Sequence, residues 1–140
     1  MKSIHLINKA FLLKKTSIFA PLDLDLLLTI ADKMDLVLYK ENDKIFVCDQ
    51  EAQRMYLIVE GVISMRGKKG ELLGELSDGE LFGDESLLNE QPRGYNAICR
   101  SPVTLLMLSR THLLSILSEC PLVALALLEA YARHVEFRKR

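Results

Sequence analysis

Residues 79–97 read GELFGDESLLNEQPRGYNA, and this stretch decides the fold. It lies within a region of short apolar runs, yet it does not alternate between apolar and polar residues as a half-buried strand does. A glycine and two acids, Gly83, Asp84 and Glu85, open one turn of helix, and Pro92 and Arg93 follow that turn. A short helix inside a β-rich region requires a physical reason.

The residue types around this turn match what a phosphate group needs. A helix that starts after Gly83 would present the backbone N–H groups of Glu85 and Ser86. Gly83 itself lets the backbone come close to a ligand. Arg93 offers a planar cation suited to phosphate oxygens, and Gly94 leaves room beside it. The stretch therefore predicts a pocket for a phosphorylated sugar rather than a catalytic centre.

The acids of the stretch allow more than one interpretation. Asp84 is a poor neighbour for a phosphate but a good acceptor for sugar hydroxyls; alternatively, it caps the short helix. Arg93 contacts the ligand, or it forms a structural salt bridge with Asp84 or Glu85. Glu85 suits the positive end of a helix as a solvated acid, whereas an inward Glu85 would repel a phosphate.

Outside this stretch, the residues of the range 35–109 show the sequence pattern of an all-β fold. Short apolar runs are separated at regular intervals by turn residues such as Glu60-Gly61 and Asp78-Gly79, which is typical of a sandwich or barrel. The predicted strands are Leu36–Tyr39, Lys44–Cys48, Met55–Val59, Val62–Met65, Leu72–Leu76, Ile98–Arg100 and Val103–Leu108.

The two ends of the chain are predicted to be helical. Asp23 can cap a helix that runs to about Met34. It follows a short basic and apolar segment, Phe11–Phe19. Two closing helices are predicted, over Leu113–Leu117 and from Leu122 to about Arg138.

Residues 82–97, called the cassette below, resemble the phosphate-binding cassette of cyclic-nucleotide-binding domains. Those domains occur in the catabolite activator protein, the regulatory subunits of protein kinase A and cyclic-nucleotide-gated channels. The family pattern reads Phe-Gly-Glu-x-Ala-Leu, then Pro-Arg-Ala-Ala-Thr. The positions that match it directly are Phe82, Gly83, Leu87, Pro92 and Arg93.

The resemblance extends over nearly the whole chain. Residues Thr16–Leu22 resemble the entry to the first helix, and Met55–Gly61 resemble a strand and glycine turn of the family's roll. The placement of the two closing helices also fits. The chain is therefore expected to be mainly β: an antiparallel β-roll of the jelly-roll type, with about seven or eight strands, N-terminal helices, a short cassette helix and C-terminal helices.

The resemblance also implies roles for individual residues. Asp84 would accept the ribose hydroxyl, Arg93 would bind the cyclic phosphate, and Ser86 would offer an N–H group to that phosphate. Asn96 stands where the family often has a ligand-contacting threonine. A residue of the last helix often covers the base in the family, a role open to Tyr131 or His134, although a tyrosine in an amphipathic helix usually serves in packing. The expected ligand-binding set is Gly83, Asp84, Glu85, Ser86, Arg93, Gly94, Tyr95 and Asn96.

This sequence departs from the family pattern at several positions. Asp84 is one methylene shorter than the usual glutamate, and Glu85 replaces an apolar residue. Tyr95 is bulkier than the usual small residue. The loop Cys48–Ala52 lacks the two glycines common in the family. These differences bear on the ligand rather than on the fold.

Composition excludes several other classes of protein. The net charge of -1 gives no electrostatic attraction to nucleic acid, so direct binding of nucleic acid is not expected. No apolar run is long enough to span a membrane, and no signal peptide is recognisable. Three widely spaced cysteines and three scattered histidines predict neither a metal site nor a disulfide framework. We therefore expect a cytoplasmic, metal-free protein that is not an enzyme.

The chain is expected to be one domain over 1–140, with a helical lead-in over 1–34, the β-roll over 35–109 and C-terminal helices over 110–140. Its first functional hypothesis is a regulatory module that binds a cyclic nucleotide, cyclic AMP before cyclic GMP, and shifts its C-terminal helix. The alternative is a degenerate domain without nucleotide that serves in protein interaction or dimerisation. The apolar last helix predicts a homodimer, or docking to a neighbouring domain, in either case. A DNA-binding output would need a helix-turn-helix after that helix.

Overall fold

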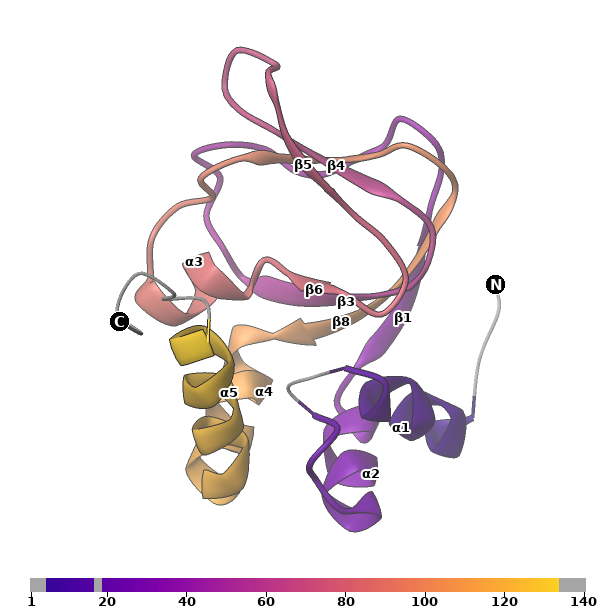
Figure 1. Cartoon of the computed structure of the whole chain (residues 1–140), viewed down its shortest axis with the longest axis vertical. Helices are drawn as coiled ribbons and strands as arrows, with labels where there is room; N and C mark the ends of the chain where they lie inside the picture. Colours follow the sequence, from indigo (N-terminus) through magenta and orange to yellow (C-terminus); the bar gives the residue numbers. More distant parts are fainter. Residues whose placement is uncertain (1–4, 17–18, 134–140) are drawn as a thin grey trace. The chain divides into compact units, whose positions relative to one another are not determined.

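The computed structural model describes residues 5–16 and 19–133 (Figure 1). These residues form two compact units. The first, called the roll unit, is Met34–Arg110 and contains all the strands described here. The second, called the helical unit, takes its described residues from 5–33 and 111–133. Each unit is described by itself below.

The roll unit is an antiparallel β-roll of two four-stranded sheets (Figure 1). One sheet has the strand order β1-β8-β3-β6 and the other has the order β2-β7-β4-β5. Apart from β4 and β5, neighbours in these orders are not consecutive in sequence, as in a jelly roll. The strands are β1 (Asp35–Tyr39), β2 (Lys44–Phe46), β3 (Arg54–Glu60), β4 (Ile63–Arg66), β5 (Leu72–Leu76), β6 (Leu81–Phe82), β7 (Asn96–Cys99) and β8 (Val103–Ser109).

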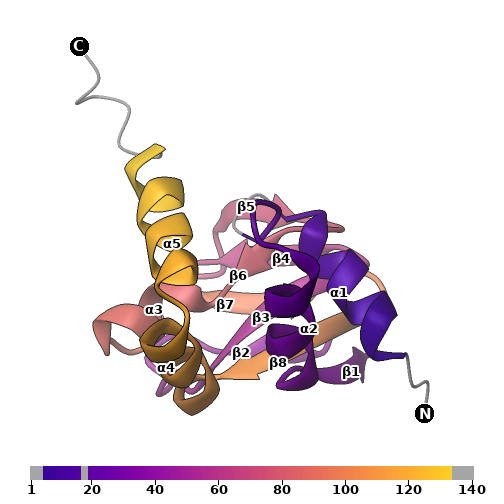
Figure 2. The same ribbon diagram turned by 90° about the horizontal axis from the view of Figure 1, so that it is seen from below.

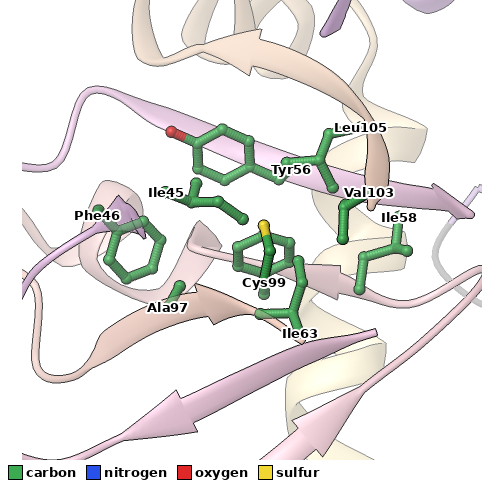
Figure 3. Close-up of a cluster of buried hydrophobic side chains, with 10 residues drawn as sticks. Ile45, Phe46, Tyr56, Ile58, Ile63, Ala97, Cys99, Val103 and Leu105 are labelled. Atoms are coloured by element: carbon green, nitrogen blue, oxygen red, sulfur yellow. The ribbon is translucent and has the colours of Figure 1, made fainter. Parts of the chain in front are cut away.

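The inward side chains of both sheets meet in a core (Figure 3). Strand β7 shows the alternation that produces it, because Ala97 and Cys99 are buried while Asn96 and Ile98 are only half-buried. Tyr56 and Phe82 stack with ring centroids 5.0 Å apart, which joins β3 to β6. The buried members of the core are Ile45, Phe46, Tyr56, Ile58, Ile63, Phe82, Ala97, Cys99, Val103 and Leu105.

All seven predicted strands are present, with bounds shifted by one or two residues at most. The prediction missed β6, since a strand of two residues leaves no period to detect. It also placed the end of the strand after the cassette at Arg100, whereas β7 ends at Cys99. The roll therefore contains eight strands within the described residues, the upper figure of the expected range.

The helical unit contains α1 (Leu6–Lys14), α2 (Leu24–Asp32) and α5 (Pro121–Arg133), together with all of α4 (Arg110–Glu119) except its first residue. Asp23 caps α2 as predicted, because its carboxylate accepts a hydrogen bond from Leu26 N at 2.9 Å. The helices α4 and α5 meet at a bend of 108° (Figure 2). The sequence predicted a helical lead-in over 1–34 but gave no bounds for α1, and the predicted end of the last helix, 134–138, lies outside the described residues.

No single described helix is long and apolar enough to cross a membrane. The pair α4 and α5 reaches the required length and composition only when counted together across its bend. Core helices of soluble proteins have the same composition, so this pair is weak evidence for a membrane span.

Candidate functional site

The cassette helix α3 (Asp84–Asn89) begins directly after β6. Gly83 is its N-cap and has a φ of 80°, in the left-handed region that glycine adopts without strain. Asp84 is therefore the first residue of the helix, and the interpretation of Asp84 as its cap is wrong. Glu90 ends the helix, also in the left-handed region, with a φ of 57°.

Gly83 is also required by its neighbours. A Cβ atom at this position would lie 3.0 Å from Nη1 of Arg93 and 3.2 Å from Cδ2 of Tyr56. The carbonyl of Arg54 would lie at 3.4 Å. The glycine thus lets the guanidinium of Arg93 pass between the start of the cassette and β3. The predicted role of Gly83, close approach of its backbone to a ligand, stays a prediction.

Arg93 is a buried cation, with 3% of its surface exposed. Its Nη1 donates to the carbonyl oxygen of Gly83 at 2.6 Å, and its Nη2 donates to that of Arg54 at 2.5 Å. Its Nε is buried and has no hydrogen-bond partner among the described residues. The two terminal nitrogens of Arg93 therefore bond to backbone carbonyls, where the sequence had left open a ligand or a salt bridge with Asp84 or Glu85.

Aromatic rings surround this guanidinium. The Cζ atom of Arg93 lies 4.0 Å from the centroid of the Phe46 ring, a cation–π contact. Tyr95 packs against the edge of the same ring at 5.2 Å, and Phe82 lies 6.0 Å from it. Phe46 and the carbonyl of Arg54 are the parts of the site that sequence reasoning missed, because their contact with Arg93 depends on the long-range pairing of strands.

The two acids of the cassette lie in different environments. Asp84 is buried, with 8% of its surface exposed, whereas Glu85 reaches solvent. Loss of hydration by the surrounding protein raises the pKa of Glu85, and its own backbone N–H counters this shift. The nearby charge of Asp84 raises the pKa of Glu85 further. Glu85 is thus the solvent-facing first-turn acid of one interpretation, placed beside a second carboxylate.

Tyr95 extends from the loop after Arg93 to Glu85. Burial raises the pKa of Tyr95, and the charge of Glu85 and a side-chain hydrogen bond between the two residues raise it further. Burial also lowers the pKa of Arg93, while the surrounding tyrosines and acids oppose that shift. The guanidinium remains a cation because an arginine does not lose its proton in a protein.

The remaining residues of the predicted ligand-binding set, Ser86, Gly94 and Asn96, lie in three different environments. Ser86 is buried, and its hydroxyl donates to the carbonyl of Pro92 at 3.4 Å. Gly94 is exposed, with no atom near the position of a Cβ. The amide of Asn96 is occupied, since its Oδ1 accepts from Cys48 N at 2.8 Å and its Nδ2 donates to the carbonyl of Gly67 at 3.1 Å.

A cavity of about 310 Å³ opens beside Arg93 within the roll unit. Polar side chains from the loop before β3 line part of its wall, namely Gln50, Glu51 and Gln53. Aromatic and apolar residues line the rest, namely Tyr39, Ile45, Phe46 and Tyr56. The site thus offers a buried cation, a flat aromatic surface and polar acceptors in one place, which suits a small polar ligand with a negative charge.

Several other residues considered in the sequence analysis do not belong to this site. His134 lies outside the described residues, and Tyr131 belongs to the helical unit. Among the described residues, no group of three or more histidine, cysteine, aspartate or glutamate side chains is placed to hold a metal ion. Cys48, Cys99 and Cys120 are free thiols, and burial raises the pKa of Cys99 to about 11.

Comparison with known proteins agrees with this geometry. The model of the cyclic nucleotide-binding domain family matches residues 36–120, which include the roll and the whole cassette. The "Cyclic AMP receptor protein" of Thermus thermophilus is 32% identical over 120 residues, which are 83% of this chain and 54% of that protein. The chain thus spans about half of the length of this relative.

Two solved structures extend the comparison. The N-terminal domain of a transcriptional regulator from Streptomyces coelicolor is 29% identical, with a TM-score of 0.77 over 89% of this chain and 90% of that one. A regulatory subunit of a cAMP-independent protein kinase A from Trypanosoma cruzi, bound to guanosine, has the same fold at 21% identity, with a TM-score of 0.72 over 86% of this chain and 45% of that one. The resemblance noted in the sequence is therefore confirmed: this chain belongs to the cyclic nucleotide-binding domain family.

Proposed function

We propose that this chain is a regulatory module that binds a cyclic nucleotide at the cassette, with cyclic AMP as its first ligand and cyclic GMP as the second. The observation that carries the proposal is Arg93, a cation with 3% of its surface exposed and a buried Nε without a partner among the described residues. A buried charge of this kind is costly unless an anion accompanies it. The cyclic phosphate is such an anion.

Binding would exchange one set of hydrogen bonds for a stronger one. Arg93 now bonds to two neutral carbonyl oxygens, those of Gly83 and Arg54. Hydrogen bonds between an arginine and a phosphate are charge-assisted and roughly twice as strong as bonds between neutral groups. Backbone N–H groups near Ser86 would add to the phosphate contact, and Asp84 would accept the ribose hydroxyl. The same set includes Gly83, Glu85, Gly94, Tyr95 and Asn96.

The signal would leave the site through the C-terminal helices. Strand β8 leads directly into α4 at Arg110, which supports a route along the chain by which a change in the roll would reach that helix. A ligand can shift that helix only if it binds one of two arrangements more tightly than the other. The relatives described above are a receptor, a transcriptional regulator and a kinase regulatory subunit, which supports a regulatory rather than a catalytic role. Three free cysteines suit a reducing compartment such as the cytoplasm.

One observation favours the second candidate, a degenerate domain that binds a protein partner instead of a nucleotide. Asp84 and Glu85 bring two adjacent carboxylates to the cassette, and the terminal nitrogens of Arg93 already have partners. Leu122, Leu125 and Leu128 of α5 are also exposed, which suits an interaction surface.

Titration calorimetry with cyclic AMP, cyclic GMP and guanosine separates the two candidates. We expect cyclic nucleotides to bind more tightly than guanosine, because only they carry the phosphate that Arg93 would hold. Arg93→Lys should weaken cyclic AMP binding by about 2–5 kcal/mol, since a lysine lacks the planar fork and leaves the carbonyls partly unpaired.

The control variant is Arg100→Lys, because Arg100 is exposed and its salt bridge is with Glu75 of β5, not with a residue of the candidate site. Circular dichroism of both variants verifies that the roll remains folded. If no cyclic nucleotide binds the wild type, or if Arg93→Lys binds cyclic AMP as the wild type does, the ligand assignment is wrong and the degenerate domain remains.

A further inference from the structure

Helix α1 of the helical unit leaves apolar side chains exposed on one side. Ala10 and Leu13 are fully buried, whereas Ile7 and Phe11 are 39% and 53% exposed. The buried pair belongs to the side on which α1 packs beside α2 (Figure 2). Ile7 and Phe11 are four residues apart, so they lie on the same side of the helix as each other. This apolar side of α1 is therefore not part of the core of the helical unit.

Two lysines extend this exposed side of α1. Lys14 and Lys15 follow Phe11 by three and four residues, so they border the same side, and both are exposed. Neither lysine forms a salt bridge with a described residue. Lys14 donates a long hydrogen bond of 3.4 Å to the carbonyl oxygen of Ala20. Ile7, Phe11, Lys14 and Lys15 are together called the α1 face below.

Buried contacts fix the end of α1 next to these lysines. Oγ1 of Thr16 donates to the carbonyl oxygen of Leu13 at 2.7 Å and accepts from Phe19 N at 3.1 Å. The backbone N–H of Lys15 donates to the carbonyl oxygen of Leu12 at 3.2 Å. Thr16 and Phe19 are both buried. The α1 face is therefore a preformed surface of a folded helix, and its order does not depend on a ligand.

The charge around the α1 face has one sign. The 22 residues before Asp23 contain four lysines and no aspartate or glutamate. The whole chain has a net charge of -1, so the residues from Asp23 onward are net negative. A basic segment in an otherwise acidic chain directs a negatively charged surface to itself. A second copy of the α1 face would repel the first, whereas an anionic surface would attract it.

The residue types of the α1 face favour a lipid surface over an acidic protein. The basic residues before Asp23 are all lysines, and no arginine is among them. Protein interfaces are enriched in arginine and depleted in lysine, because the planar fork of arginine suits the fixed geometry of a carboxylate. A lysine can lay its apolar stem beside Phe11 and keep its ammonium group in water. Aromatic and aliphatic side chains next to lysines are typical of helices that lie at the boundary between lipid headgroups and acyl chains.

From these features we propose that the α1 face binds an anionic lipid surface. Ile7 and Phe11 enter the boundary between headgroups and acyl chains, and Lys14 and Lys15 contact the lipid phosphates. The contact is peripheral and reversible, since stable anchoring takes a second signal beyond one small patch. It involves no residue of the cassette and does not require a nucleotide.

Flotation of the full chain with vesicles, in the absence of nucleotide, tests this inference. Phosphatidylcholine vesicles that contain about 30% phosphatidylserine should carry the wild type upward, whereas vesicles of phosphatidylcholine alone should not. Binding should fall about tenfold between about 0.05 M and about 0.5 M salt, because salt screens the lysines. Phe11→Gln should lower the affinity for anionic vesicles about fivefold, because it removes the larger apolar side chain of the face. Its matched control is Leu73→Gln, which removes a side chain of the roll that is 56% exposed and should leave binding unchanged.

A pair of double variants tests the charge of the face. Lys14→Gln with Lys15→Gln should lower the affinity for anionic vesicles at least about tenfold. Lys40→Gln with Lys44→Gln removes the same charge from exposed lysines of the roll unit and should bind nearly as the wild type does. If these two double variants lose binding equally, net charge rather than the α1 face attracts the vesicles, and the inference is wrong.

The other outcomes are equally decisive. Equal binding to both kinds of vesicle, or unchanged binding by Phe11→Gln, would overturn the inference. A wild type that binds neither kind would also overturn it and would leave an acidic protein surface as the occupant of the α1 face. If Phe11→Gln does not fold, as judged by thermal denaturation, the lysine variants alone decide. Arg93→Lys should float as the wild type does, so a failure of the proposed nucleotide site leaves this inference intact.

Discussion

At the scale of single residues, the burial of Arg93 sets the energetics of the site. Removal of a guanidinium from water costs several kcal/mol unless hydrogen bonds and nearby charge compensate it. Two carbonyls and the face of Phe46 offset part of this cost, the ring by about 0.5–2 kcal/mol. The unpartnered Nε retains a penalty of about 1–3 kcal/mol. An anion at this position would relieve that penalty, so the unliganded site favours an anionic ligand.

Glu85 should make ligand binding depend on pH. Its pKa is raised, so it gains a proton at a higher pH than a free glutamate does. Protonation removes a negative charge near the cyclic phosphate, whose own charge is constant over this range. The affinity for cyclic AMP should therefore rise by about twofold to fivefold as the pH falls from neutral into the range where Glu85 gains its proton, which begins at a higher pH than for a free glutamate; calorimetry measures this rise.

Two variants isolate the contribution of Glu85. Glu85→Gln should bind cyclic AMP more tightly than the wild type at about pH 8 and should lose most of the pH dependence. The matched control is Glu80→Gln, because Glu80 is exposed and lies just before the cassette in the sequence. This variant should retain the pH dependence of the wild type. An unaltered pH profile in Glu85→Gln would show that this carboxylate does not face the phosphate.

At the scale of elements, the loop between β2 and β3 is shaped by a residue in a strained conformation. Asp49 has a φ of 72°, and its backbone N–H donates to the carbonyl of Arg93 at 2.8 Å. The loop Cys48–Ala52 lacks the glycines common in the family. Asp49, within this loop, nevertheless has the left-handed backbone that a glycine would adopt without strain. The ion pair of Asp49 with Lys68 compensates little, since both side chains are 67% exposed.

Asp49→Gly should therefore stabilise the chain. Glycine adopts this backbone without strain, so we expect the free energy of unfolding to rise by about 0.5–1 kcal/mol, and the melting temperature by about 2 °C. Asp49→Ala is the matched control, because it loses the same ion pair but keeps the strain, and it should melt below the wild type. A glycine variant that melts no higher than the alanine variant would contradict this explanation. Thermal denaturation followed by circular dichroism measures all three proteins.

The elements also show what the sequence could and could not predict. The strand Leu72–Leu76 was predicted to the residue, because the turn residues before and after it, Gly67–Gly70 and Asp78-Gly79, are local signals. The bounds of helix α1 were not predicted within the helical lead-in, because the helix buries only Ala10 and Leu13 and leaves Phe11 exposed, so it has no clear apolar stripe. The cassette was predicted from its motif. The carbonyl of Arg54 was not, since it reaches Arg93 through pairing across 39 residues.

At the scale of the whole molecule, the last helix offers a surface for assembly. Leu122, Leu125 and Leu128 of α5 are 60%, 51% and 67% exposed and follow one another at intervals of three residues. Ala126 is instead buried, together with Val123 and Leu127, on another side of the helix. The exposed leucines alone therefore define the candidate surface.

We expect this surface to mediate a homodimer, or contact with a neighbouring segment in a longer protein, because a row of exposed leucines on a helix is stabilised when another surface covers it. Sedimentation of the wild type should show a dimer that dissociates on dilution. Leu128→Lys should shift it to monomer without lowering its melting temperature, since Leu128 is exposed. Leu73→Lys is the matched control, because Leu73 of β5 is 56% exposed but lies on the roll, and it should remain dimeric. A wild type that stays monomeric at every concentration would exclude the homodimer and leave contact with another segment as the role of this face.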